Sequence, residues 1–564
     1  MNKFTVISAI ACKPLRILLT GLLIIGHPLI SFAQTDKPVI DQQSQDSAII
    51  TPGKTAPAAI DNAQTPVLDL GENADQIVAE IKTIRFSGNS VLGNDHLAPI
   101  AVPFENTQMT RGDLIRLKYE LTRAYYNQGY VLVRVLTPPQ DLSDGILNVH
   151  IVEARIGAMH LEFAGLDESL ASHYAQRIPV GEVFQESVVE SAVSDINDMA
   201  GVKSRILLKP GKETGTTDVH LKIEPDDDAK HAFSLDNSGS DFTGAVNANL
   251  HLAGHNALGR GEKFGLHLRK SVGGKNEDLT RISVDMKMPL AWSNWHLESQ
   301  LLWSENEIGD RLVALNSTGE SQQLGLALSR TLVNTLAHQS KIRVGLESRK
   351  HESTLAGVNE SSDSISQVFV EADGVWRYGS RWVVYASARL LQGVNWLGAD
   401  EIGESDATRA QGDPEALIFR PTFFTSFHPA SKDSISLTLQ AQSTDDVLLS
   451  SDLFAIGGEG SVRGFEPGAE FAEDGYQLSV QYNRKFSAGG RTLTASVFYD
   501  LGHVNGKLAN TIQDDTLKSV GLGMNMKLPK MDSRISLQVG FPTGTYTDKT
   551  LEDQVFYARF SRQF

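Results

Sequence analysis

Residues 519–528 of this 564-residue chain read Ser-Val-Gly-Leu-Gly-Met-Asn-Met-Lys-Leu. Every second residue is apolar, from Val520 to Leu528, and the positions between carry Ser, Gly, Asn and Lys. Because the side chains of a strand point alternately to opposite faces, the stretch predicts a β-strand with one apolar face and one small, polar face.

The same alternation recurs between residues 231 and 564, for example at 282–288, 435–440 and 535–541. A soluble β-sandwich also alternates, but small polar residues make a poor sandwich core and suit a water-filled lumen. At roughly 20 residues per strand and connection, this region gives about sixteen antiparallel strands. We therefore predict a transmembrane β-barrel over residues 231–564.

The end of the chain supports a barrel in an outer membrane. Phe556, Ala558, Phe560 and Phe564 share one face of a predicted terminal strand, which Arg562 interrupts near the rim. A last strand that ends in Phe is typical of outer-membrane barrels. Phe560 and Phe564 are therefore the predicted C-terminal barrel signature.

The N-terminus predicts export from the cytoplasm. In residues 1–33, Lys3, Lys13 and Arg16 precede a short apolar run, and small residues follow before Gln34, as in a secretory signal peptide. The run is too short for a membrane-spanning helix, which needs about 20 residues. The only cysteine, Cys12, lies in this segment, so the mature chain has no disulfide, iron–sulfur or cysteine–zinc chemistry.

Between the signal peptide and the barrel we predict a linker and two small mixed α/β modules. Residues 34–78 are polar and rich in Pro, and only the Pro-free piece 39–51 could form a short helix. The first module covers 79–155 and the second 156–226. The predicted elements of the first are strands at 81–87, 131–137 and 146–153 and a helix from Thr110 to Gly129; those of the second are a strand at 159–163, a helix at 185–200 and two strands ending near Ile223.

The most informative segment for function is 457–468, Gly-Gly-Glu-Gly-Ser-Val-Arg-Gly-Phe-Glu-Pro-Gly. It lacks the spacing and the following helix of a phosphate-binding loop, and a mobile surface loop is the plain alternative. In the predicted strand 493–501, Phe498 and Asp500 face the lumen. A carboxylate inside a barrel needs a cation, and Arg463 on an inward-folded loop would supply it.

These residues carry a family resemblance. Val462-Arg463-Gly464-Phe465 resembles the Val-Arg-Gly-Tyr/Phe motif on the sixth extracellular loop of the Omp85 superfamily, and Phe498-Tyr499-Asp500 resembles its Phe-x-Asp motif. The two modules resemble POTRA domains, which are β-α-α-β-β units in the periplasm. Two POTRA domains before such a barrel are similar to the TpsB transporters of two-partner secretion, the ShlB/FhaC/HecB group. The stretches 127–130, 236–240 and 257–262 fit that group.

The resemblance implies a function and its partners. The protein would lie in the outer membrane of a Gram-negative bacterium and export, without a cofactor, a large TpsA-like exoprotein such as a haemolysin, a haemagglutinin-type adhesin or a haem-binding protein. Its POTRA domains would bind the client, and Arg463 would pair with Asp500. Lipid and the barrel assembly machinery are further implied partners, and whether the chain activates its client stays open. The family's pore-plugging helix has only residues 39–51 as a candidate.

Other functions have weaker support. An assembly factor of the Omp85 type would be expected to carry more than two POTRA domains, and a passive porin would have none. The sequence contains no Gly-x-Ser-x-Gly, His-Glu-x-x-His or EF-hand motif, so we predict no catalytic residues. His251 and His255 lie in the barrel region and do not predict a metal site. The net charge of −17, without a basic cluster, argues against nucleic-acid binding.

Overall fold

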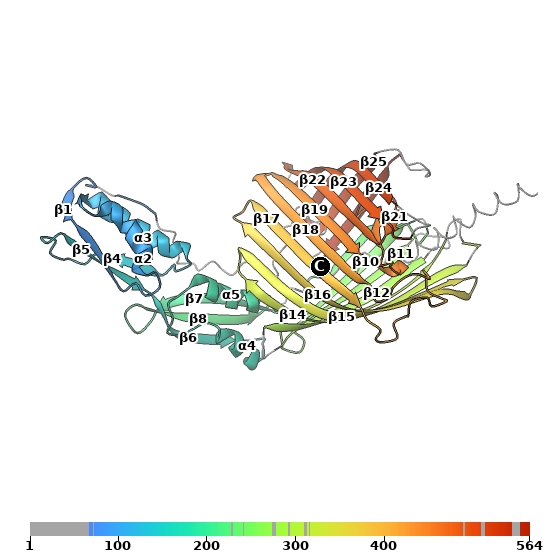
Figure 1. Cartoon of the computed structure of the whole chain (residues 1–564), viewed down its shortest axis with the longest axis horizontal. Helices are drawn as coiled ribbons and strands as arrows, with labels where there is room; N and C mark the ends of the chain where they lie inside the picture. The colour runs from blue at the N-terminus through green and yellow to red at the C-terminus, as the bar shows by residue number, and fades with distance from the viewer. Residues whose placement is uncertain are drawn as a thin grey trace, which may run out of the picture. The chain divides into compact units, whose positions relative to one another are not determined.

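The computed structural model describes residues 67–564, except for 71–72, 227–228, 241, 273–277, 291–293, 310–312, 315, 489–490, 509–513 and 544–552. The predicted signal peptide and the helix candidate at 39–51 lie outside the described residues. The chain divides into two compact units. One holds the two modules together with residues 259–261, and the other holds the barrel (Figure 1).

The first module is a three-stranded sheet with two principal helices. Its strands are ordered β2-β5-β4, with β2 parallel to β5 and β4 antiparallel to it. Helix α3 begins at the predicted place, because the Thr110 hydroxyl accepts from the Asp113 N–H and the Asp113 carboxylate accepts from Thr110. The elements are β1 (Ile77–Ile81), β2 (Thr83–Ser87), α2 (Asn94–Ala101), the 3₁₀ turn η3 (Val102–Phe104), β3 (Thr107–Thr110), α3 (Arg111–Asn127), β4 (Val133–Leu136) and β5 (Ile146–Glu153).

The second module repeats this plan. Its sheet has the order β6-β8-β7, again with a parallel and an antiparallel pair. On β8, Val219, Leu221 and Ile223 are buried, as period-two patterning requires. The elements are β6 (Arg155–Phe163), α4 (Glu168–Ala175), α5 (Glu186–Asn197), β7 (Val202–Pro210) and β8 (Thr216–Pro225).

Three details differ from the elements that the sequence predicts. The strand predicted at 81–87 is two strands, because β1 leaves the module sheet to pair with β3. The helix predicted at 185–200 is shorter, running from Glu186 to Asn197. Helices α2 and α4 were not predicted individually from the pattern, since each has only eight residues and α2 contains Pro99.

The two modules share one hydrophobic cluster. Val131, which follows α3 of the first module, is buried with Ile156, Phe184 and Val189 of the second. The Gly129 carbonyl also accepts a hydrogen bond of 2.9 Å from the N–H of Glu186. The Asn-Gln-Gly-Tyr stretch at 127–130 therefore leads directly into the contact between the modules.

The barrel has sixteen strands in the part of the chain that the structure describes, as predicted, and it closes where β9 pairs with β26. All neighbouring strands are antiparallel (Figure 1). The strands are β9 (Ala232–Asp236), β10 (Val246–His255), β11 (Lys263–Val272), β12 (Asp278–Pro289), β13 (Trp295–Glu307), β14 (Ser317–Asn334), β15 (His338–Leu355), β16 (Val358–Tyr378), β17 (Trp382–Gly393), β18 (Leu417–Ala430), β19 (Asp433–Thr444), β22 (Asp474–Ala488), β23 (Arg491–Asn505), β24 (Asp514–Leu528), β25 (Ser533–Pro542) and β26 (Val555–Gln563).

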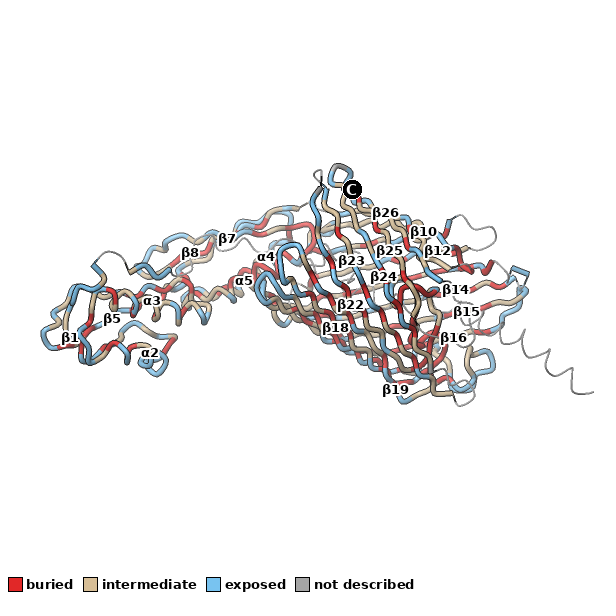
Figure 2. Tube along the Cα trace, turned by 90° about the horizontal axis from the view of Figure 1, so that it is seen from above, coloured by how far each residue is buried: buried red, intermediate tan, exposed pale blue. Residues whose placement is uncertain are grey.

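The wall alternates as the sequence predicts. On β24, Val520, Leu522 and Met524 are exposed on the outer surface, whereas Ser519 is fully buried on the other face. Figure 2 shows buried and more exposed residues alternating along the barrel strands. The outer surface is therefore apolar and the lumen polar. Within the described residues, no helix has the length and hydrophobicity needed to span a bilayer.

Candidate functional site

The candidate site lies on the long connection between β19 and β22, residues 445–473, which we call the lumen loop. It contains the short turn η5 (Ser450–Asp452) and a two-stranded hairpin of β20 (Phe454–Ile456) and β21 (Glu470–Ala472). Most of its side chains are buried, and they contact inward-facing residues of the wall. The loop therefore folds into the barrel interior.

Arg463 is the largest fully buried side chain of the described residues and is only 1% exposed. Its guanidinium donates to both carboxylate oxygens of Asp500, with Nε–Oδ2 at 2.7 Å and Nη2–Oδ1 at 2.8 Å. The Arg463 backbone N–H also donates to Asp500 Oδ2, at 3.1 Å. This bidentate geometry is the strongest form of an arginine–carboxylate contact.

The remaining donors of Arg463 are satisfied by three other wall residues. Nη1 donates to Gln481 Oε1 on β22 and to Gln538 Oε1 on β25, each at 2.9 Å. Nη2 also donates to Ser479 Oγ at 3.1 Å, and that hydroxyl donates to Asp500. All five N–H donors of the guanidinium therefore have an acceptor, which is what a buried arginine requires.

Asp500 and Phe498 lie on the inner face of β23. Asp500 is completely buried and Phe498 nearly so, while Val497 and Tyr499 between and beside them are exposed on the outside. The ring centroid of Phe498 lies 3.4 Å from the Arg463 guanidinium carbon, a close cation–π contact. The structure thus brings together Arg463, Phe498 and Asp500.

The neighbours of Arg463 fit the loop against the wall. Val462 and Phe465 are buried in a cluster with Val504 of β23 and Leu517 of β24. Gly464 has a φ of +101°, which disfavours any residue with a Cβ. Its N–H donates to the Tyr557 hydroxyl at 3.0 Å, and that hydroxyl donates to the Phe465 carbonyl.

The wall glycine Gly540 faces Gly464. A Cβ on Gly540 would lie 2.5 Å from the Gly464 nitrogen and 2.7 Å from the Arg463 carbonyl carbon. The loop backbone consequently touches the wall backbone at this point. Sequence reasoning missed this glycine and also Ser479, Gln481, Gln538 and Tyr557, because alternation places a residue on the inner face without showing which inner-face residues the loop reaches.

The two residues of the predicted C-terminal barrel signature, Phe560 and Phe564, are not among the contacts of Arg463. Phe560 is on β26 opposite Leu235 of β9, at the seam that closes the barrel. Phe564 follows β26, its side chain is exposed, and its backbone exchanges hydrogen bonds with His231. His251 and His255 lie on β10, and the ring of His251 stacks on the ring of His267. Among the described residues, no group of three or more His, Cys, Asp or Glu side chains could hold a metal ion.

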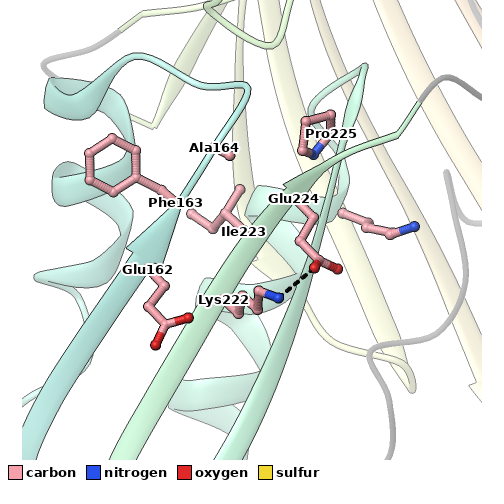
Figure 3. Close-up of a pocket in the computed structure, with 8 residues that line it drawn as sticks. Glu162, Phe163, Ala164, Lys222, Ile223, Glu224 and Pro225 are labelled. Atoms are coloured by element: carbon pink, nitrogen blue, oxygen red, sulfur yellow. Dashed lines mark ion pairs between the residues drawn. The ribbon is translucent and has the colours of Figure 1, made fainter.

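The second module offers a surface feature of its own. A pocket of about 570 Å³ lies at the ends of its three strands, lined by Glu162, Phe163, Ala164, Lys203, Lys222, Ile223, Glu224 and Pro225. Lys222 Nζ and Glu224 Oε1 lie 2.7 Å apart on β8 (Figure 3). The lining therefore combines apolar surface with charges of both signs.

Two family models match this chain. Residues 215–526 match a family model described as haemolysin secretion/activation protein ShlB/FhaC/HecB, and residues 79–154 match one described as POTRA domain, ShlB-type. The first match covers more than half of the chain. The chain belongs to the ShlB/FhaC/HecB family.

Individual relatives are distant in sequence but similar in length. The heme/hemopexin transporter protein HuxB of Haemophilus influenzae (strain 86-028NP) is 22% identical over 78% of this chain and 79% of HuxB. The outer membrane transporter CdiB of Dickeya dadantii (strain 3937) is 26% identical over 73% and 71%. The solved structure of CdiB from Escherichia coli is 20% identical, covers 95% of this chain and 98% of that one, and has a TM-score of 0.75, which shows the common fold.

Membership in this family confirms the predicted function class. The chain is an outer-membrane transporter of two-partner secretion, and its POTRA domains lie in the periplasm. A secreted exoprotein is its partner. The family consists of transporters and is not known for enzymes.

Proposed function

We propose that this ShlB/FhaC/HecB transporter exports one large exoprotein in extended form, and that the contact between Arg463 and Asp500 holds the lumen loop in place at rest. The observation that supports this role is the complete set of acceptors around Arg463, supplied by β22, β23 and β25. A fully satisfied buried arginine holds a loop in one position, whereas removing one partner leaves an uncompensated charge.

The receiving surface for the client is the outer edge of β7 in the second POTRA domain. β7 is an edge strand of nine residues, and an extended segment can add to such an edge by main-chain hydrogen bonds. Lys203, Arg205 and Lys209 alternate along it, with exposed Leu207 between them. These side chains suit a client segment with acidic and apolar residues.

Site-specific crosslinking tests this surface. A photoreactive amino acid at Leu207, which is 52% exposed, is expected to capture the exoprotein during export. The matched control carries the same group at Val180, which is 54% exposed in the same domain but lies outside β7. Equal capture at both positions, or none at Leu207, would contradict the assignment of β7.

The client is a large exoprotein such as a haemolysin, a haemagglutinin-type adhesin or a haem-binding protein. Deletion of the transporter is expected to remove one large polypeptide from the culture medium while other outer-membrane barrels assemble normally. A general loss of barrels would instead indicate an assembly factor. Comparing the activity of the client made with and without the transporter decides whether export also activates it.

The remaining partners act on the barrel itself. Its apolar outer face contacts outer-membrane lipid, and Phe560 and Phe564 present the C-terminal strand to the barrel assembly machinery. Replacing Phe564 by Ala is expected to lower the amount of folded barrel in the membrane, with Phe556→Ala on the same strand as control. Equal folding in the two variants would rule out a special role for the terminal residue.

A further inference from the structure

The lumen loop contacts the wall at a second place, on strands β15, β16 and β18. Asp452, in the turn η5, is only 3% exposed. Its carboxylate accepts from Arg349 Nη2 of β15 at 2.6 Å, Gln367 Nε2 of β16 at 2.9 Å and Arg420 Nη2 of β18 at 3.1 Å. Three strands therefore converge on one loop carboxylate.

Two wall residues, Arg349 and Gln442, also bind the backbone of η5. Arg349 Nη1 donates to the Ser451 carbonyl at 3.3 Å, and Gln442 Nε2 donates to the Asp452 carbonyl at 2.8 Å. Arg420 in turn donates through Nε to Gln442 Oε1 at 2.7 Å. Side chain and backbone of η5 are thus bound by one connected network.

The charges make Asp452 difficult to replace. It lies between Arg349 and Arg420, whose side chains are 12% and 15% exposed, and the carboxylate of Glu347 lies farther from Arg349, at 3.9 Å. Without the Asp452 charge, the two arginines would face each other in a buried site with reduced compensation. The Asp452 carboxylate therefore stabilises the two arginines of the wall, and the arginines in turn hold η5.

The hairpin between the two contacts is apolar on both faces. Leu453 and Phe471 pack with Phe369, Leu391 and Ile418 of β16, β17 and β18. The next residue on each hairpin strand, Phe454 and Ala472, belongs to the cluster with Val462, Val504 and Leu517. Alternate residues of the hairpin thus bind two separate arcs of the wall.

We propose that Asp452 is a second anchor of the lumen loop, which keeps η5 on the β15–β18 arc when the Arg463–Asp500 contact opens. The two anchors share no side chain: the Arg463 contacts come from β22, β23 and β25, and the Asp452 contacts from β15, β16, β18 and β19. Contacts without shared partners contribute independently. This inference rests on the proposed role of the loop in export and deepens it.

Cysteine labelling tests the independence of the anchors, because Cys12 is the only native cysteine and lies in the predicted signal peptide. Ser451→Cys reports on the second anchor and Ala472→Cys on the cluster beside the first, since both residues are small and buried. Each probe is combined with Asp452→Asn or with Asp500→Asn, and the rate of maleimide labelling of the folded, membrane-embedded protein is measured.

Asp452→Asn is expected to speed labelling at 451 about tenfold or more, since labelling follows the open population and a charged hydrogen-bond network is lost. It is expected to leave labelling at 472 within about twofold of the parent, and Asp500→Asn is expected to give the reverse pattern. The control Asp433→Asn removes a carboxylate paired with Arg484 away from the loop and is expected to change neither probe.

Unchanged labelling at 451 in Asp452→Asn would overturn the second anchor, and equal acceleration at both probes would show that the loop opens as one unit. Heat-modifiable migration in gels identifies variants that fail to fold, and Asp452→Ser is then used in the same assay. Labelling does not require a client. The labelling could therefore show two independent anchors while gene deletion leaves the exoprotein in the medium unchanged. That pair of results would refute the export proposal and leave the second anchor standing.

Discussion

The backbone nitrogen of Gly464 lies 3.0 Å from the hydroxyl oxygen of Tyr557, which lies 93 positions later in the chain. Tyr557 is on β26, the strand that pairs with β9 to close the barrel. The strand that completes the wall therefore also holds the loop in the lumen.

Replacing Tyr557 by Phe is expected to loosen the lumen loop without removing the aromatic ring. The change deletes one acceptor for Gly464 and one donor to Phe465, at a cost of about 1 kcal/mol for each lost hydrogen bond. Limited proteolysis of the folded barrel should cut the loop faster. Tyr499→Phe, on the outer face of β23, is the control, and equal cleavage of the two variants would argue against this contact.

Removing the charge pair is expected to abolish or strongly reduce secretion. Arg463→Ala or Asp500→Ala leaves one buried charge without its partner, which costs about 3–5 kcal/mol. The exoprotein in the medium is measured against the amount of folded barrel in the membrane, some of which should persist. Arg484→Ala, which removes an exposed pair with Asp433, is the control. Normal secretion by both Arg463→Ala and Asp500→Ala would refute the role assigned to them.

Adding one methyl group at Gly540 is expected to displace the lumen loop. The new Cβ would lie 2.5 Å from the Gly464 nitrogen, so the backbones must separate, at about 1–3 kcal/mol. A lower temperature of barrel unfolding in gel assays should report this strain. Gly325→Ala is the matched control, because its nearest neighbour would be 3.7 Å away. If both variants unfold at the parental temperature, the loop and wall do not touch tightly at this position.

The first POTRA domain is expected to lose stability in mild acid through Glu153. Burial raises the pKa of Glu153, but hydrogen bonds from Ser90, Val91 and Tyr125 outweigh it and hold the pKa below its ordinary value. A carboxyl group whose pKa is lower in the folded state than in the unfolded state stabilises the fold above the pKa of the unfolded state, about 4.3. This stability is lost as the pH falls through the pKa of the folded state.

Hydrogen exchange of the full-length protein measures this effect. Amides of the first domain should lose protection below about pH 4.3. Glu153→Gln should already lack part of that protection at pH 7 and show a weaker pH dependence. An identical pH profile for the variant and the parent would mean that another carboxylate controls the domain.

The barrel could be predicted from the sequence because the alternation of apolar and polar residues is visible within a single strand. One stretch such as 519–528 reveals both faces of its strand, and the same logic placed Asp500 toward the lumen. The capping residues Thr110 and Asp113 located helix α3 for a similar reason, since their contacts span three positions.

The partners of Arg463 could not be predicted in this way. Gln538 is 75 positions away, and the height at which it faces the loop depends on the register between β23, β24 and β25. Alternation gives the face on which a side chain lies but not its height in the barrel. The role of Asp452 could not be predicted for the same reason, because the three wall residues that bind its carboxylate lie 32 to 103 positions away in the sequence.

The hydrophobic cluster between the two POTRA domains has a consequence for dissecting the transporter. Val131 packs with Ile156, Phe184 and Val189, so cutting the chain between the domains would expose a hydrophobic surface on the second domain. A truncated protein that starts at residue 156 would then bind other proteins non-specifically through this surface, for reasons unrelated to client recognition. The two domains share this cluster, so loss of export after deletion of the first domain cannot by itself identify that domain as the receptor.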